Sequence, residues 1–140
     1  SASNDSSNFL REIQSALLVH RVGTSVGAMP ARRALRMATV GGAEVLGRPE
    51  IGRIAPGYAA DLAVFNLERI DFAGAMADPV AAPVFCGGGV RAEYTIVGGR
   101  IIVENSQLVG LDEKRLVHRA NEIAARMLRA AEKWTGRKYA

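Results

Sequence analysis

The side chains that could do chemistry are few and widely separated in this sequence. Its two histidines, His20 and His118, lie near opposite ends of the chain. Neither belongs to a pair at the i, i+4 spacing by which two imidazoles on one helix share a metal. We therefore expect His20 to form an ordinary hydrogen bond at the end of a helix, and neither histidine to be a ligand. Because Cys86 is the only cysteine, an internal disulfide framework and a thiolate metal cage are excluded.

Three further candidates each have a functional and a structural interpretation. Cys86 has no adjacent base to activate its thiol, so the sequence predicts a buried, inert cysteine. The glycines at 87–89 lack the lysine and the helix start of a phosphate-binding loop, and they predict a mobile turn. Asp61 lies in an apolar segment and could be catalytic, but we favour a structural hydrogen bond to turn amides.

The opening residues form the densest group of small polar side chains. Ser1, Ser3 and Asn4 stand just before a predicted helix, where loop amides and hydroxyls can point at a ligand. Ordinary helix capping is the alternative interpretation. The sequence begins at Ser1 without an initiator methionine, and we expect it to be part of a longer protein.

Composition limits the class of protein. The 140 residues are 49% hydrophobic and 23% charged, with a net charge of +4, which suits one small domain or part of a larger one and excludes disorder. No apolar run approaches the roughly 20 residues that span a membrane. The pI near 9.7 permits acidic partners, but the basic residues are spread along the chain, so nucleic-acid binding is only a weak third hypothesis. Without targeting signals, we expect a cytoplasmic protein.

Two helices are predicted in the first third of the chain. A helix over 5–20 follows from Phe9, Ile13 and Leu17, which recur at i, i+4 and i+8 after several candidate N-caps. A second helix has Pro30 in its first turn. The glycines at 41–42 should weaken it before it ends near Gly47.

The remainder predicts strands and one long helix. We expect a strand start at 51, a type II turn at Pro56-Gly57, a buried strand over 61–66 and loops over 68–92. Gly98-Gly99 predicts a hairpin between strands at 94–97 and 100–104, with a short third strand at 107–109. Asp112 caps a helix to about 134 whose basic stripe is a solvated face. Apolar strands need cover on both faces, so we expect them to pack on sequence absent from this chain.

Four stretches resemble one known family. They are SASNDSSN at 1–8, ATVGGAEVLG at 38–47, IGRIAPGYAADLAVF at 51–65 and IVGGRIIV at 96–103. Together they are similar to the C-terminal part of amidohydrolase-superfamily deaminases. The structural signature within them is Gly57, Asp61, Gly98 and Gly99. FAGA at 72–75, DPVAA at 78–82 and Phe85-Cys86 favour the branch of 8-oxoguanine deaminase over the hydroxyatrazine-type aminohydrolases.

The resemblance implies an α/β architecture that is incomplete in this chain. Residues 1–48 would be the last loop and closing helices of a metal-dependent (β/α)8 barrel. Residues 49–110 would be part of a small β-sandwich, and 111–140 a C-terminal helix packing on the barrel. The partners implied are the N-terminal remainder of the same protein, which supplies barrel and partner strands, and a further copy of the protein in a homo-oligomer. No membrane and no nucleic acid is implied.

The resemblance also implies where the chemistry lies. The family holds its metal with a His-x-His pair, a further histidine and an aspartate, and all of these would precede Ser1. No metal ligand and no catalytic residue is therefore expected in this chain. Ser1, Ser3 and Asn4 would lie at the mouth of the barrel, shaping the substrate pocket and orienting the metal aspartate.

The activity implied is hydrolytic deamination of a purine-like ring of the 8-oxoguanine or guanine type. The cofactor of the intact protein would be a divalent metal, with zinc favoured over iron. A triazine aminohydrolase or chlorohydrolase is the alternative within the family. An autonomous, non-catalytic binding or assembly domain is the alternative from another class.

Overall fold

The computed structural model describes residues 7–139. The chain divides after Ser106 into two units. The helices of the first unit are α1 (Phe9–Gly23), α2 (Ala31–Arg36), η1 (Met37–Gly41), α3 (Gly42–Val45), η2 (Ile70–Phe72), η3 (Ala75–Ala77), α4 (Ala82–Cys86) and η4 (Gly87–Gly89). Its strands are β1 (Leu62–Val64), β2 (Tyr94–Val97) and β3 (Arg100–Glu104). The second unit contains β4 (Gln107–Leu108) and α5 (Glu113–Thr135).

The helix α1 begins four residues later than the sequence predicts. Of the candidate caps, Asn8 is the one used, and its side-chain oxygen accepts a hydrogen bond from the amide of Arg11. The buried face is Leu10, Ile13 and Leu17, whereas Phe9 is exposed. The predicted helical stripe is therefore confirmed, but shifted by one position at its first member.

The second predicted helix ends where the sequence predicts, but it is continuous through its glycines. Pro30 is its N-cap, one position before the first turn. After α2 the chain continues through the π-helical turn η1 and into α3 without leaving helical geometry, so the glycines at 41–42 do not interrupt it. A π turn widens the backbone ring by one residue and lets a helix absorb poor helix formers. The helix ends before Gly47, whose φ of +65° is the left-handed conformation expected there.

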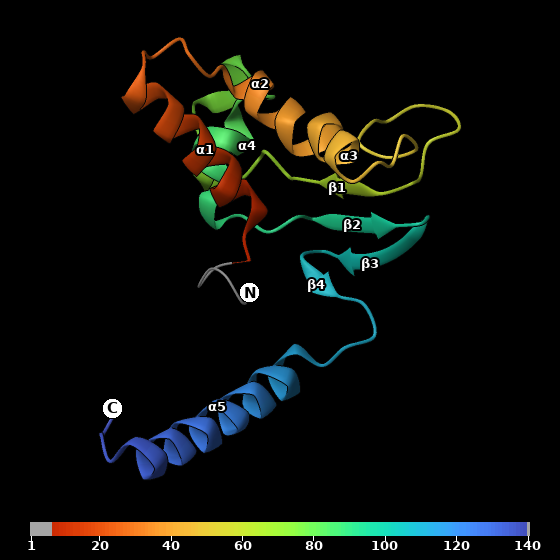
Figure 1. The fold of residues 1–140 in the computed structure, drawn as a ribbon. Coiled ribbons are helices and arrows are strands. Elements are labelled where there is room, and N and C mark those ends of the chain that lie inside the picture. The colour runs from red at the N-terminus through yellow and green to blue at the C-terminus, as the bar shows by residue number, and fades with distance from the viewer. Residues whose placement is uncertain (1–6, 140) are drawn as a thin grey trace. The chain divides into compact units, whose positions relative to one another are not determined.

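The prediction of loops over 68–92 is wrong in part, because this segment folds into four short helical turns. Before α4, one side-chain oxygen of Asp78 accepts the amides of Val80 and Ala81. Pro83 lies in the first turn of α4, where a missing N–H costs nothing. Val84 of this turn is fully buried. Figure 1 shows α4 lying beside α1, and α1 contacts both α2 and α4.

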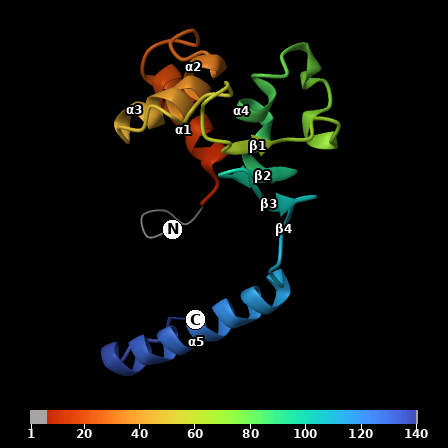
Figure 2. The same cartoon turned by 90° about the vertical axis from the view of Figure 1, so that its right-hand side faces the viewer.

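The strands of the first unit form an antiparallel sheet in the order β1-β2-β3. Leu62 pairs with Ile96 between β1 and β2. The hairpin of β2 and β3 turns at Gly98-Gly99, as predicted, and contains a register shift at Thr95/Ile96. Figure 2 shows β1, β2 and β3 one beside the next. The predicted short strand after the hairpin is confirmed as β4, whereas the strand start predicted at 51 is a series of bends.

The buried core of the first unit is helical. One cluster of buried side chains comes from α1, α2, α4 and the connection before α2, and its members are Leu10, Ile13, Leu17, Met29, Ala31, Ala34 and Val84. A second cluster is Phe72, Ala82 and Val90. The prediction of a buried strand over 61–66 is wrong: β1 covers only Leu62–Val64, and Val64 is exposed. No strand residue belongs to either cluster, so the apolar strand pattern is not matched by burial within the described residues.

The second unit is dominated by the amphipathic helix α5. Asp112 is its N-cap, accepting the amide of Arg115 at 3.0 Å, and Gly136 ends it with a φ of +68°. Both ends agree with the sequence prediction. No residue of α5 is buried, and its exposed large apolar side chains are Leu116, Val117, Ile123, Met127, Leu128 and Trp134.

Candidate functional site

The predicted substrate-pocket residues, Ser1, Ser3 and Asn4, lie outside the described residues. The structure describes the chain from Ser7, directly before the cap of α1. The Asn8 side chain has two roles there. Its oxygen accepts the amide of Arg11 at 3.3 Å, and its nitrogen donates to the carbonyl of Gly88 at 3.0 Å.

The glycine run at 87–89, for which the sequence predicts a mobile turn, is a helical turn in which Gly87 and Gly88 contact α1 and Gly89 is exposed. Gly87 is buried against α1, and a Cβ at this position would approach Leu10 Cδ1 to 3.0 Å. The run forms the helical turn η4, whose Gly88 carbonyl accepts from Asn8. A phosphate-binding loop presents amides to its ligand. In this turn a carbonyl, that of Gly88, is the group that makes the contact, and it accepts a hydrogen bond.

The prediction that Cys86 is buried is also wrong, because its side chain is exposed. Cys86 is the last residue of α4, while Val84 two positions earlier faces α1 and fills the core. The short helix therefore directs the valine inward and leaves the thiol at the surface. The carbonyl of Phe85, between them, accepts from the side-chain nitrogen of Gln14 at 2.8 Å.

Asp61 has the structural role that the sequence favours. Its Oδ1 accepts the amide of Gly98 at 2.7 Å, and the neighbouring Ala60 carbonyl accepts the amide of Gly99 at 3.1 Å. Gly98 and Gly99 have φ values of +55° and +77°, so they adopt a turn in which other residues are strained. The residues before β1 thus hold both amides of the hairpin turn. Asp61 is exposed rather than buried.

The turn around Gly57 is confirmed as type II. The amide of Tyr58 donates to the carbonyl of Ala55 at 3.1 Å, and Gly57 has a φ of +85°. A second glycine in this segment, Gly52, was not singled out by the sequence. A Cβ on Gly52 would lie 2.8 Å from the main-chain oxygen of Thr39, so the segment touches the helix backbone there. Three signature residues, Gly57, Gly98 and Gly99, are turn glycines, and the fourth, Asp61, accepts a turn amide.

The two histidines are surface residues with local partners. His20 Nδ1 lies 2.8 Å from the carbonyl of Ala16, as expected for a histidine at a helix end. His118 Nε2 lies 3.3 Å from a carboxylate oxygen of Glu122. Within residues 7–139, no group of three or more His, Cys, Asp or Glu side chains could hold a metal ion. The described part of the chain therefore does not fit a metal centre.

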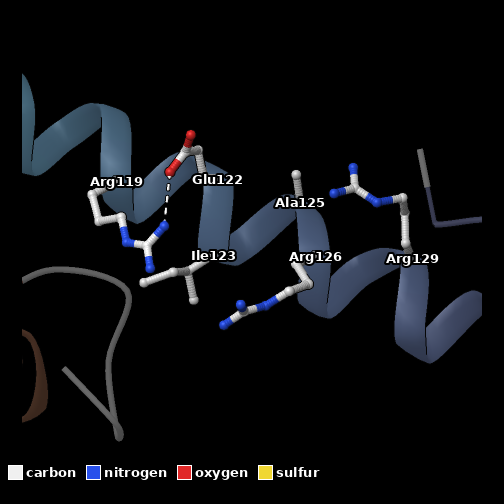
Figure 3. A pocket seen from close by; sticks show the side chains of 6 residues that line it. All are labelled: Arg119, Glu122, Ile123, Ala125, Arg126 and Arg129. Atoms are coloured by element: carbon white, nitrogen blue, oxygen red, sulfur yellow. Dashed lines mark hydrogen bonds and ion pairs between the residues drawn. The ribbon is translucent and has the colours of Figure 1, made fainter.

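A shallow depression follows one stretch of α5 (Figure 3). Its charged side chains are three arginines and one glutamate, and Arg119 donates to Glu122 at 3.0 Å. Figure 3 shows Ile123 on the same side of the helix as Arg119 and Arg126. The lining residues are Arg119, Glu122, Ile123, Ala125, Arg126 and Arg129. All of them come from one helix, so the depression is a feature of the helix surface and has no second wall.

A second pocket, of about 430 Å³, lies between α3 and the bends that follow it. Apolar side chains such as Val40 and Ile51 line it, together with the charged Glu44, Arg48 and Arg53. Arg48 is engaged with the adjacent Glu50, at 2.6 Å between Nε and Oε1. A hydrogen bond from its own main chain, and then the Arg48 guanidinium, lower the pKa of Glu50 below its ordinary value.

None of the described helices is long and apolar enough to cross a lipid bilayer. The longest, α5, alternates charged and apolar side chains throughout its length.

Two characterised proteins and one solved structure are similar to this chain over most of its length. Hydroxydechloroatrazine ethylaminohydrolase of Pseudomonas sp. (strain ADP) is 37% identical over 130 residues, which are 91% of this chain and 27% of that protein. 8-Oxoguanine deaminase of Pseudomonas aeruginosa is 38% identical over 128 residues, 91% of this chain and 28% of that protein. The zinc complex of atrazine chlorohydrolase from Arthrobacter aurescens TC1 matches with a TM-score of 0.79 and 38% identity, over 87% of this chain and 27% of that one.

The chain thus spans less than a third of the length of the relatives that it matches. Its α/β fold, with an antiparallel sheet and helices, corresponds to part of a larger amidohydrolase structure. The sequence model of the Amidohydrolase family matches residues 1–102. The chain belongs to the amidohydrolase family.

Proposed function

We propose that this chain is the C-terminal segment of a metal-dependent amidohydrolase that hydrolytically deaminates a purine-like ring of the 8-oxoguanine or guanine type. The observation that carries the proposal is the match of 91% of the chain to 8-oxoguanine deaminase at 38% identity. The sequence features favouring that branch are in 72–86, the segment that folds into the short helices η2 to α4.

In this proposal, residues 1–48 close a (β/α)8 barrel, 49–110 form part of a β-sandwich, and 111–140 pack on the barrel. Exposed apolar side chains support an incomplete unit. Burying a large apolar side chain stabilises a protein by about 1.5–3 kcal/mol, yet Leu116, Met127 and Leu128 of α5 are exposed. Ile101 of β3 is exposed as well. The proposed partner for these faces is the N-terminal remainder of the same protein, and the intact enzyme is a homo-oligomer.

The metal of the proposed enzyme is zinc in preference to iron, and residues 7–139 contain no group of three or more side chains that could hold it. Its ligands would belong to the N-terminal remainder. The contribution proposed for this chain is to shape the substrate pocket through Ser1, Ser3 and Asn4, and to support that pocket through α1.

The test is purification of the intact protein that contains this chain, followed by native mass spectrometry, metal analysis and an amine-release screen. The proposal predicts a species larger than 14.9 kDa, about one divalent metal per protomer, and release of ammonia from 8-oxoguanine or guanine. The 140-residue chain prepared alone is the control and should be inactive. A metal-bearing protein that releases no ammonia from either purine contradicts the proposed substrate.

A triazine-directed enzyme is the second candidate, because a triazine aminohydrolase matches at nearly the same identity, 37% over 130 residues. The screen separates the two by the substrate and the leaving group. N-alkylated hydroxytriazines would release an alkylamine, and aminopurines would release ammonia. Turnover of the triazine alone favours this second candidate.

A non-catalytic binding or assembly domain is the candidate of another class. It predicts a metal-free monomer or simple multiple of 14.9 kDa that unfolds cooperatively. Rapid association of the isolated chain through its apolar strands and helix contradicts it.

A further inference from the structure

The apolar side chains of α5 recur at alternating spacings of four and three residues. This is the heptad spacing with which a helix packs lengthwise against another element through a narrow strip of side chains. We call this strip the seam, and its members are Leu116, Ala120, Ile123, Met127, Ala130 and Trp134. None of them is buried, and Trp134 is 88% exposed, so residues 7–139 leave the seam largely uncovered.

One edge of the seam carries a positive charge in every heptad. Arg119, Arg126 and Lys133 are seven residues apart, and each directly precedes a member of the seam. Figure 3 shows Arg119 and Arg126 on the same side of the helix as Ile123. Side chains at this position of a heptad flank the contact and select the partner by charge. Arg126 makes no ion pair with any residue that the structure describes.

The charges argue against a second copy of α5 as the partner. In an antiparallel pair of such helices, the two basic edges would face each other and repel. In a parallel pair, the basic edge would face the opposite edge of the seam, which has no charge to offer. That edge consists of Val117, Ala124 and Ala131. A surface with carboxylates along one side is the complementary partner.

The length of the relatives indicates where such a surface is found. The 128 matching residues are 28% of 8-oxoguanine deaminase, so more than two-thirds of that relative has no counterpart in this chain. The match to the atrazine chlorohydrolase structure covers 87% of the chain. Because only 111 residues precede Asp112, that match includes part of the α5 segment. A relative therefore has this segment together with a long stretch of protein that is absent here.

We propose that the seam of α5 docks in an apolar groove on the N-terminal remainder of the protein, and that carboxylates along one side of this groove pair with Arg119, Arg126 and Lys133. The acidic side fixes the direction of the helix, because a reversed helix would present its cations to the other side of the groove. This inference rests on the proposed function for the existence of the remainder, and adds the chemistry by which the remainder receives α5.

The first test identifies the carboxylate by zero-length coupling in the intact protein. Arg126→Lys introduces a primary amine, which a carbodiimide joins directly to a carboxylate in contact with it. Arg129→Lys is the matched control, because Figure 3 shows Arg129 on the side of Ala125 and away from Ile123. After digestion, mass spectrometry should find position 126 linked to an aspartate or glutamate that precedes Ser1 in the intact protein. The control should give no such link.

The second test measures amide hydrogen exchange over 116–131 in the intact protein. Arg126→Glu replaces an attraction with a repulsion and should accelerate exchange about tenfold, whereas Arg129→Glu should change it less than about twofold. Because salt screens charges at the edge of a contact, the effect of Arg126→Glu should decrease at about 1 M salt.

The results separate the possible partners. A link from position 126 to the remainder, within a product that keeps the mass of one protomer, supports the proposal. A product of twice that mass identifies a second copy and overturns the choice of partner, as does a link only to residues 7–139 of the same chain. Equal exchange in the two glutamate variants overturns the acidic side of the groove. A protein that forms the predicted link but deaminates no ring retains the docking and contradicts the proposed function alone.

Discussion

Substitution of Asp61 tests whether the signature residue Asp61 stabilises the β2–β3 turn through its hydrogen bond to Gly98. The Asp61 carboxylate accepts the Gly98 amide at 2.7 Å, and Gly98 is the first residue of the β2–β3 turn. Asp61→Ala removes the acceptor and leaves this amide to water. Asp61→Asn keeps an acceptor oxygen and removes only the charge. The two variants therefore separate the hydrogen bond from its ionic component.

The expected magnitude follows from the bond type. A hydrogen bond to a charged group contributes about 1.5–3 kcal/mol, and the exposure of Asp61 places this bond at the lower limit. A loss of about 1.5 kcal/mol accelerates local opening at Gly98 about tenfold, because about 1.4 kcal/mol corresponds to a factor of ten. A neutral bond contributes about 1 kcal/mol, so Asp61→Asn should accelerate opening only about twofold.

Residue-resolved amide exchange in the intact protein measures this directly. The Gly99 amide is an internal reference, since it donates to the Ala60 carbonyl and not to a side chain. Asp71→Ala is the control, because Asp71 pairs with Arg69 at the surface at 3.4 Å. The reasoning fails if Asp61→Ala leaves exchange at Gly98 unchanged, or if Asp61→Asn exchanges as fast as the alanine variant.

Three further predictions concern other parts of the chain. In a urea titration, Gly52→Ala should lower the free energy of unfolding by more than about 2 kcal/mol, because it adds a main-chain clash to a φ of +84°. Gly57→Ala is the control, because Gly57 has a similar φ of +85° but open space around it, and it should lower the free energy of unfolding by about 1 kcal/mol. In an NMR pH titration, the pKa of Glu50 should be below the ordinary glutamate value, because its main-chain hydrogen bond and Arg48 stabilise the carboxylate. Its contribution to stability is complete above the ordinary glutamate pKa and is lost as the pH falls through the lowered pKa. Arg48→Gln should raise that pKa only part of the way, because the main-chain hydrogen bond remains; a return to the full value contradicts this cause. Asp112→Ala should weaken the first turn of α5 by about 1 kcal/mol in amide exchange, whereas serine at this position should preserve it.

The elements that the sequence predicts well are those governed by local signals. Asp112 and Gly136 bound α5 because capping and left-handed glycine act within one turn. Gly98-Gly99 defines its hairpin for the same reason, since few residues adopt two consecutive positive φ values. The sequence predicts that Asp61 accepts a turn amide, but it does not identify that amide as the one of Gly98.

The elements that the sequence misses depend on distant partners. The glycine run at 87–89 has the composition of a mobile loop, and no local signal predicts that Gly87 and Gly88 contact α1. Asn8 and Gln14 have no local signal for their second role, because the carbonyls that they bind are in another segment. The apolar pattern of β1 predicts burial, but burial depends on what covers the strand. Ser1, Ser3 and Asn4 remain predictions, since they lie outside the described residues.

The way the sheet is connected has a consequence for the order of folding. β2 and β3 are joined by a two-residue turn, whereas β1 pairs with β2 only after the chain has passed through η2, η3, α4 and η4. Because the entropy lost on closing a loop increases with its length, the hairpin should form before β1 joins it. Pulse-labelled exchange during refolding should then protect 94–104 earlier than 62–64. Substitutions in the hairpin should slow folding, while substitutions in β1 should mainly accelerate unfolding.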